Sequence, residues 1–103
     1  ALEVGAFLKE QLLKLAKEFP IIGDVRGQGF FLGMELVDAQ KKPLPKQTDY
    51  LINRMKAHGI LMSSDGPDHN VLKIKPPLVF SKKNAQQLLY YLKKILAEDV
   101  MII

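Results

Sequence analysis

The 103-residue chain contains no cysteine. It can therefore form no disulfide, and it offers neither a thiolate nucleophile nor a cysteine-based zinc site. This fits a reducing compartment, so we expect a cytoplasmic location, or a mitochondrial one if the source is a eukaryote. No apolar run approaches the roughly 18 residues of a membrane-spanning helix, and we expect no membrane partner. The start, Ala1-Leu2-Glu3-Val4, does not resemble a secretory signal, because it lacks a basic region followed by an apolar stretch.

What is present is typical of one globular domain covering residues 1–103. The chain is 48% hydrophobic and 25% charged, which excludes a disordered chain. The net charge of +4 raises an RNA-binding alternative. The lysines are spread along the chain, however, and both a Gly-x-x-Gly loop and the paired strand aromatics of an RNA-recognition motif are missing. We therefore predict no nucleic-acid partner.

Three segments have helical periodicity. The first covers residues 1–18 and ends before Pro20. The second covers residues 48–58, with Thr48 as its cap and Gly59 as its end. The third follows a Ser81 cap and has one apolar stripe, formed by Ala85, Leu88, Leu89, Leu92, Ile95 and Leu96.

Three other segments are predicted to be extended. Residues 25–37 form one long strand with Phe30, Leu32, Met34 and Leu36 on one face, and its glycines mark bulges or close backbone approaches. Residues 60–63 and 71–75 form two short strands separated by a turn-rich loop. The order αβαββα predicts an α+β fold, with a small antiparallel or mixed sheet of three to four strands and helices packed on one face.

Several patterns that suggest chemistry have simpler explanations. Gly27-Gln28-Gly29 leads into a strand rather than a helix, so it is a poor phosphate cradle. Asp65, Asp68 and His69 could meet a metal, but turn chemistry explains all three. Lys82 follows the helix cap at an exposed helix start, where nothing activates it for Schiff-base chemistry. We therefore predict no catalytic, cofactor-binding or metal-binding residue in the chain.

Lys73 and Lys75 are the most informative pair. They are two residues apart on a predicted strand, so their side chains share a face, about 6–7 Å apart along the chain. Two ammonium groups on one face can bind a phosphate or a carboxylate. The alternative is that they form the solvent-exposed face of an ordinary sheet.

Two motifs resemble one family. The segment Asp24-Val25-Arg26-Gly27-Gln28-Gly29-Phe30-Phe31-Leu32-Gly33-Met34-Glu35-Leu36 resembles the opening of the small domain of class III aminotransferases. The segment Val71-Leu72-Lys73-Ile74-Lys75-Pro76-Pro77-Leu78 resembles a later strand of the same domain. The resemblance runs from about residue 1 to residue 96 and has both motifs in order, so the chain is identified as similar to the C-terminal small domain of this family.

The resemblance also implies candidate substrate contacts. In the family, an arginine that grips a substrate carboxylate usually stands before the two prolines, and Lys73 takes its place here. A lysine cannot reproduce the planar fork of an arginine. Together with Ser64-Asp65-Gly66-Pro67 and Asn70, this departure resembles the phospho-lyase branch acting on ethanolamine phosphate or phosphohydroxylysine. We therefore expect Lys73, helped by Lys75, Asn70 or Arg26, to bind the anionic end of the substrate. Alternatively, Arg26 ties its loop to a neighbouring carboxylate.

The family resemblance further implies pyridoxal 5'-phosphate as the cofactor, a small amine or amino acid as the substrate, and either transamination or phosphate elimination. The catalytic lysine and most cofactor contacts would lie in a large domain outside this chain, so the chain alone is expected to be inactive, and the full-length enzyme to be a homodimer. A stand-alone ligand-binding or regulatory α+β module is the alternative. A domain separated from its large domain should expose an apolar docking patch, and a stand-alone module should not.

Overall fold

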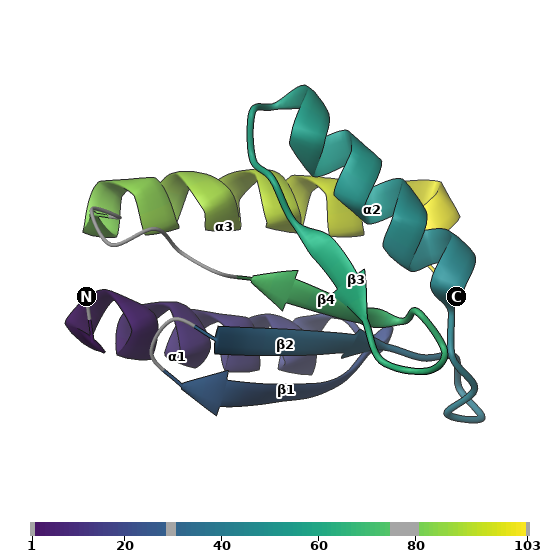
Figure 1. The fold of residues 1–103 in the computed structure, drawn as a ribbon. Coiled ribbons are helices and arrows are strands. Elements are labelled where there is room, and N and C mark those ends of the chain that lie inside the picture. Colours follow the sequence, from purple (N-terminus) through teal and green to yellow (C-terminus); the bar gives the residue numbers. More distant parts are fainter. Residues whose placement is uncertain (1, 29–30, 75–80, 103) are drawn as a thin grey trace.

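The computed structural model describes residues 2–28, 31–74 and 81–102 (Figure 1). Within these described residues, three helices, four strands and one short 3₁₀ helix follow one another in the order α1 (Leu2–Glu18), β1 (Ile22–Gln28), β2 (Phe31–Leu36), α2 (Pro45–Ala57), β3 (Ser63–Asp65), β4 (Val71–Ile74), α3 (Lys82–Leu96) and η1 (Asp99–Met101). The strands form one sheet in the order β1-β2-β4-β3, and every neighbouring pair is antiparallel. The predicted α+β fold with a small sheet is confirmed.

The long strand predicted over residues 25–37 is wrong in one respect, because it is a hairpin of two strands. Val25 pairs with Met34 and Gln28 pairs with Phe31, so β1 runs back along β2. Gly27 has φ +102°, a backbone conformation that other residues adopt only with strain. Gly27 therefore makes the close backbone approach that we expected of these glycines, and it does so within a hairpin and not within one continuous strand.

One face of the sheet is covered by helices. Leu32, Met34 and Leu36 of β2 are buried and alternate with more exposed neighbours, as predicted for this face. Across the register, Leu72 and Ile74 of β4 point the same way and are also buried. Burying each such side chain contributes about 1.5–3 kcal/mol. The helices complete a single core with apolar side chains that include Leu8, Leu12, Leu51, Met55, Leu88 and Leu92.

The helix ends follow local chemistry. Ser81 caps α3 as predicted, and its hydroxyl accepts from the Asn84 amide in a capping box. The predicted Thr48 cap is wrong, because α2 begins at Pro45, with Leu44 as the capping residue. Proline suits the first helical turn, where its missing N–H would have no partner. Thr48 is instead buried inside the helix, and its hydroxyl donates to the carbonyl of Leu44 at 2.9 Å.

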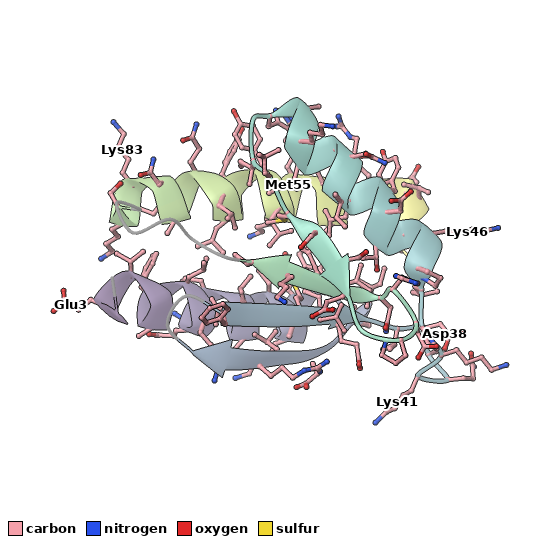
Figure 2. All side chains as sticks on the ribbon, in the orientation of Figure 1. Glu3, Asp38, Lys41, Lys46, Met55 and Lys83 are labelled. Atoms are coloured by element: carbon pink, nitrogen blue, oxygen red, sulfur yellow. The ribbon has the colours of Figure 1, made fainter. Side chains whose placement is uncertain are left out.

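The helices pack against one another as well as on the sheet. In Figure 1, α1 lies behind β1 and β2, and α3 contacts both α1 and α2. Figure 2 shows Lys41, Lys46 and Lys83 pointing away from the molecule, while Met55 of α2 lies inside it. The C-terminal segment docks through Met101, which is 1% exposed. No described helix is long and apolar enough to cross a membrane.

Candidate functional site

The face of the sheet opposite the helices carries charged side chains in two rows. The register places Arg26 opposite Gly33, Gly33 opposite Lys73, and Lys73 opposite Ser63. Two residues away along the strands, a second row consists of Asp24, Glu35, Val71 and Asp65. Cations therefore stand in one row and carboxylates in the next.

Both cations lean toward the carboxylate row. Lys73 Nζ lies 3.2 Å from Asp65 Oδ2. Arg26 Nη1 lies 3.0 Å from Asp24 Oδ2 and 3.8 Å from Glu35 Oε2. Arg26 thus contacts neighbouring carboxylates, as its alternative role requires, but from strand β1 and not from a loop. Because the Lys73 side chain is still 33% exposed and that of Arg26 is 52% exposed, both can also reach a ligand on this face.

A hollow of about 300 Å³ lies between the two cations. Its floor is Gly33, whose missing side chain leaves room between Arg26 on β1 and Lys73 on β4. The backbones of β1 and β4 are two strand spacings apart, about 10 Å. The remaining lining residues are Gly27, Phe31, Leu32, Asp65, Gly66 and Val71. An arginine and a lysine on either side of an open floor can hold a phosphate or a carboxylate between them.

Asn70 lies on the other side of the sheet. Its side chain is 4% exposed, and Nδ2 donates to the carbonyl of Leu36 at 3.0 Å. The Leu36 amide donates back to the carbonyl of Asn70 at 2.9 Å, which extends the β2–β4 ladder by one residue. The structure thus brings Arg26 and Lys73 together at the hollow, while the carboxamide of Asn70 joins two backbone segments. Lys75 lies outside the described residues.

The structure also shows where the glycine cluster and the residues considered for a metal site lie. Gly27 and Gln28 belong to β1 and pair with β2, so the described part of the glycine cluster leads into a hairpin and not into a helix. Within residues 2–28, 31–74 and 81–102, no three histidine or acidic side chains gather as a metal would require. Asp65, one of the three residues considered for a metal, contacts Lys73 instead.

A second charged cluster joins α2 to the segment after α3, and sequence reasoning did not predict it. Glu98 accepts a hydrogen bond from Arg54 Nη2 at 2.9 Å and another, short one from the hydroxyl of Tyr50. These two bonds hold the pKa of Glu98 below its usual value, with the larger effect from Arg54. The same contact with Glu98 raises the pKa of Tyr50. The partners lie more than 40 residues apart in sequence, which no local spacing can reveal. The cluster fastens α2 to the segment that follows α3.

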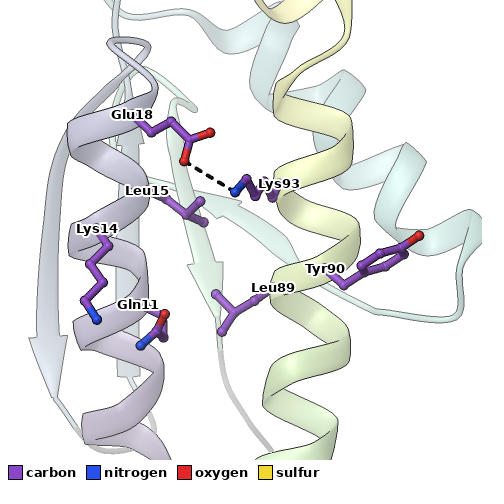
Figure 3. A pocket seen from close by; sticks show the side chains of 7 residues that line it. All are labelled: Gln11, Lys14, Leu15, Glu18, Leu89, Tyr90 and Lys93. Carbon is purple, nitrogen blue, oxygen red and sulfur yellow. Dashed lines mark ion pairs between the residues drawn. The ribbon is translucent and has the colours of Figure 1, made fainter.

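A second hollow, of about 370 Å³, lies between α1 and α3. In Figure 3, Leu15 and Leu89 point toward the space between the helices, while the ring of Tyr90 points away from α1. Lys93 and Glu18 form an ion pair at 3.5 Å across the two helices. None of the predicted site residues lines this hollow, so the open sheet face remains the candidate site.

Comparison with known proteins relates this fold to one family of enzymes. Residues 1–96 match the family model described as aminotransferase class III. The chain is 48% identical over 92 residues to the alanine–glyoxylate aminotransferase 2-like protein of Drosophila melanogaster, covering 86% of this chain and 19% of that protein. It is 37% identical over 97 residues to the ethanolamine-phosphate phospho-lyase homolog 1 of Caenorhabditis elegans, covering 91% and 21%.

A solved structure is similar in three dimensions. It is a phospholyase from Arthrobacter in complex with phosphoethanolamine, with a TM-score of 0.90 and 37% identity. The match covers 94% of this chain and 24% of that one. The chain thus spans about a fifth to a quarter of the length of the proteins it resembles.

Proposed function

The chain belongs to the class III aminotransferase family, and we propose that it is the C-terminal small domain of a pyridoxal-phosphate enzyme acting on a small amine or amino acid. The two family motifs occur in order, and the match covers almost the whole chain but only about a fifth of each curated relative. The large domain of the same polypeptide would be the principal partner, and the full-length enzyme would be a homodimer. We propose no nucleic-acid or membrane partner, and the cytoplasmic location stays a prediction.

Two exposed apolar side chains support the proposal that a large domain docks on this chain. Phe31 begins β2 and is 63% exposed, and Leu61, two residues before β3, is 80% exposed. Because β2 and β3 both run antiparallel to β4, the two side chains lie at the same end of the sheet. A large domain docked over this end would cover them, as the family resemblance implies, whereas a stand-alone module would leave them in water.

The described residues do not fit the cofactor itself. A lysine that holds pyridoxal phosphate needs burial or a neighbouring cation to lower its pKa. Of the described lysines, only Lys9 and Lys73 are partly buried, and Lys73 contacts the carboxylate of Asp65 instead. We therefore propose that the cofactor is bound outside the described residues, in the large domain that the family resemblance implies, and we expect the isolated chain to be inactive. Mixing it with pyridoxal phosphate should give no specific absorbance of a lysine-bound cofactor, and such a band would contradict the proposal.

Within that enzyme, the hollow on the open face would bind the anionic end of the substrate. The observation that carries this proposal is the pair of cations, Arg26 and Lys73, on either side of the Gly33 floor. Lysine in place of the family's arginine favours a phosphate over a carboxylate. A carboxylate loses the two parallel hydrogen bonds of the arginine fork, whereas a phosphate can be bound by the point charge of a lysine. This favours phosphate elimination over transamination.

Lys73→Ala in the full-length enzyme tests the proposal. Loss of one charge-assisted contact should raise KM for a phosphorylated amine roughly 10- to 100-fold. Lys93→Ala is the matched control, since Lys93 contacts Glu18 on the helical side and should leave KM unchanged. An unchanged KM in Lys73→Ala would remove Lys73 from the site.

A further inference from the structure

The contact between Lys73 and Asp65 is diagonal across the β3–β4 ladder. Lys73 stands directly opposite Ser63, and Asp65 stands opposite Val71. The register therefore gives Lys73 a short polar neighbour, and its long side chain reaches along the sheet to the next row to meet Asp65 at 3.2 Å. The ammonium is drawn toward the carboxylate row, at the same hollow that both residues line.

We propose that Asp65 is an internal competitor of the substrate anion: it occupies Lys73 in the unliganded protein and releases it when a phosphate binds. This inference rests on the proposed function, since it takes the hollow as the anion site. Asp65 thereby sets how tightly the site holds phosphate, and its deletion strengthens binding rather than weakening it.

The exposure of the pair makes the exchange feasible. The side chain of Asp65 is 60% exposed, so its carboxylate can turn into water when a ligand takes its place. Exposed ion pairs change an equilibrium by up to about fivefold. The ligand's apparent affinity equals its affinity for free Lys73 multiplied by the fraction of molecules in which Asp65 does not occupy Lys73. A phosphate, with a charge between about −1.5 and −2, can then bind Lys73 without overcoming a buried ion pair.

The released carboxylate continues to act on the bound ligand. It remains on the same face, and it repels a phosphate more than a singly charged acetate because the repulsion grows with ligand charge. Removing Asp65 should therefore help phosphate more than acetate. In an enzyme that eliminates phosphate, the same repulsion, together with recapture of Lys73, would assist release of the inorganic phosphate product.

The experiment titrates the 103-residue chain with inorganic phosphate, and in parallel with acetate, and follows the backbone amide signals of residues 71–74 by NMR. Asp65→Asn should bind phosphate about three- to tenfold more tightly than the wild type, with a smaller gain for acetate, and the gain should shrink as salt is added. Asp65→Ser provides a second variant with the same expected sign. Glu10→Gln is the matched control. It removes one negative charge from the exposed ion pair between Glu10 and Lys14 on α1 and should leave the phosphate affinity unchanged.

The outcomes separate the two proposals. If Lys73→Gln abolishes the phosphate response but both Asp65 variants bind phosphate no more tightly than the wild type, the competitor role is wrong while the anion site stands. An equal gain in Glu10→Gln would also overturn it, because net charge alone would explain the effect. If the wild type gives no response, or Lys73→Gln responds as the wild type does, the proposed anion site fails, and this inference fails with it.

Discussion

The Cβ atom that Gly27 lacks would stand 2.0 Å from the carbonyl oxygen of Phe31, across the ladder between β1 and β2. No real Cβ approaches a backbone oxygen so closely, so a larger residue must displace one of the two strands. Gly27 also has φ +102°, which strains any other residue. The hairpin that leads to the candidate site therefore depends on glycine at this position.

Gly27→Ala should lower the free energy of unfolding by more than about 3 kcal/mol, because positive-φ strain is added to a backbone clash. Gly59→Ala is the matched control. Gly59 has φ +78° with nothing within 4 Å of the added Cβ, so only the strain of about 1–2 kcal/mol remains. Urea denaturation of both variants measures the difference. Equal losses of unfolding free energy in the two variants would show that the clash with Phe31 does not contribute.

The sequence predicted the elements whose signals are local. The apolar stripe of α3, its Ser81 cap and the alternation of Leu32, Met34 and Leu36 all appear in the structure as expected. The hairpin was missed because the glycines between its strands were interpreted as features of one strand, although the buried positions change from odd-numbered at Val25 to even-numbered at Leu32 and Met34. The start of α2 was misplaced because Thr48, a common capping residue, was preferred to Pro45, although proline is favoured in a first helical turn.

Replacing Asn70 tests whether its side chain stabilises the fold or binds the substrate. Its buried carboxamide donates to the carbonyl of Leu36, so Asn70→Ala should leave that carbonyl without this donor and lower the free energy of unfolding by about 1–3 kcal/mol. Thermal or urea unfolding of the chain gives this value. In the full-length enzyme, KM should change far less than in Lys73→Ala. A raised KM at unchanged stability would instead support the substrate contact that the sequence suggested.

The candidate site was only partly predictable. Alternation within β4 put Lys73 on a face away from the core, and this follows from sequence alone. Its pairing with Asp65, the Gly33 floor and the position of Arg26 depend on which strands are neighbours and in what register. Sequence spacing carries no such information. The expectation that Asn70 accompanies Lys73 came from the family resemblance, and in the structure the two side chains lie on opposite sides of the sheet.

The Glu98 cluster predicts a pH-dependent stability. The folded-state pKa of Glu98 lies below the ordinary value of 4.5, so the contribution of its bonds is complete above about that pH. The contribution is lost as the pH falls through the lowered pKa. Glu98→Gln should therefore reduce Tm at pH 7, and its difference from the wild type should shrink from pH 5 toward pH 3. Calorimetry across this range measures it, with Glu10→Gln as a control of little effect at any pH. A difference that stays constant would exclude the ion pair as its source.

Lys73→Arg tests whether this position selects the anionic group of the substrate. An arginine fork can bind a carboxylate through two parallel hydrogen bonds, which the lysine cannot do, whereas a phosphate is already well served by a point charge. In the full-length enzyme, the ratio of kcat/KM for β-alanine to that for ethanolamine phosphate should rise about tenfold, a change of about 1.4 kcal/mol in relative transition-state binding. The ratio isolates the choice of anion, because a general loss of folding or cofactor would lower both constants together. Lys93→Arg, on the far side of the core, should leave the ratio unchanged. If Lys73→Arg changes kcat/KM equally for both substrates, Lys73 does not contact the anionic group in which they differ. The lysine that stands in place of the family's arginine would then affect only the stability of the sheet.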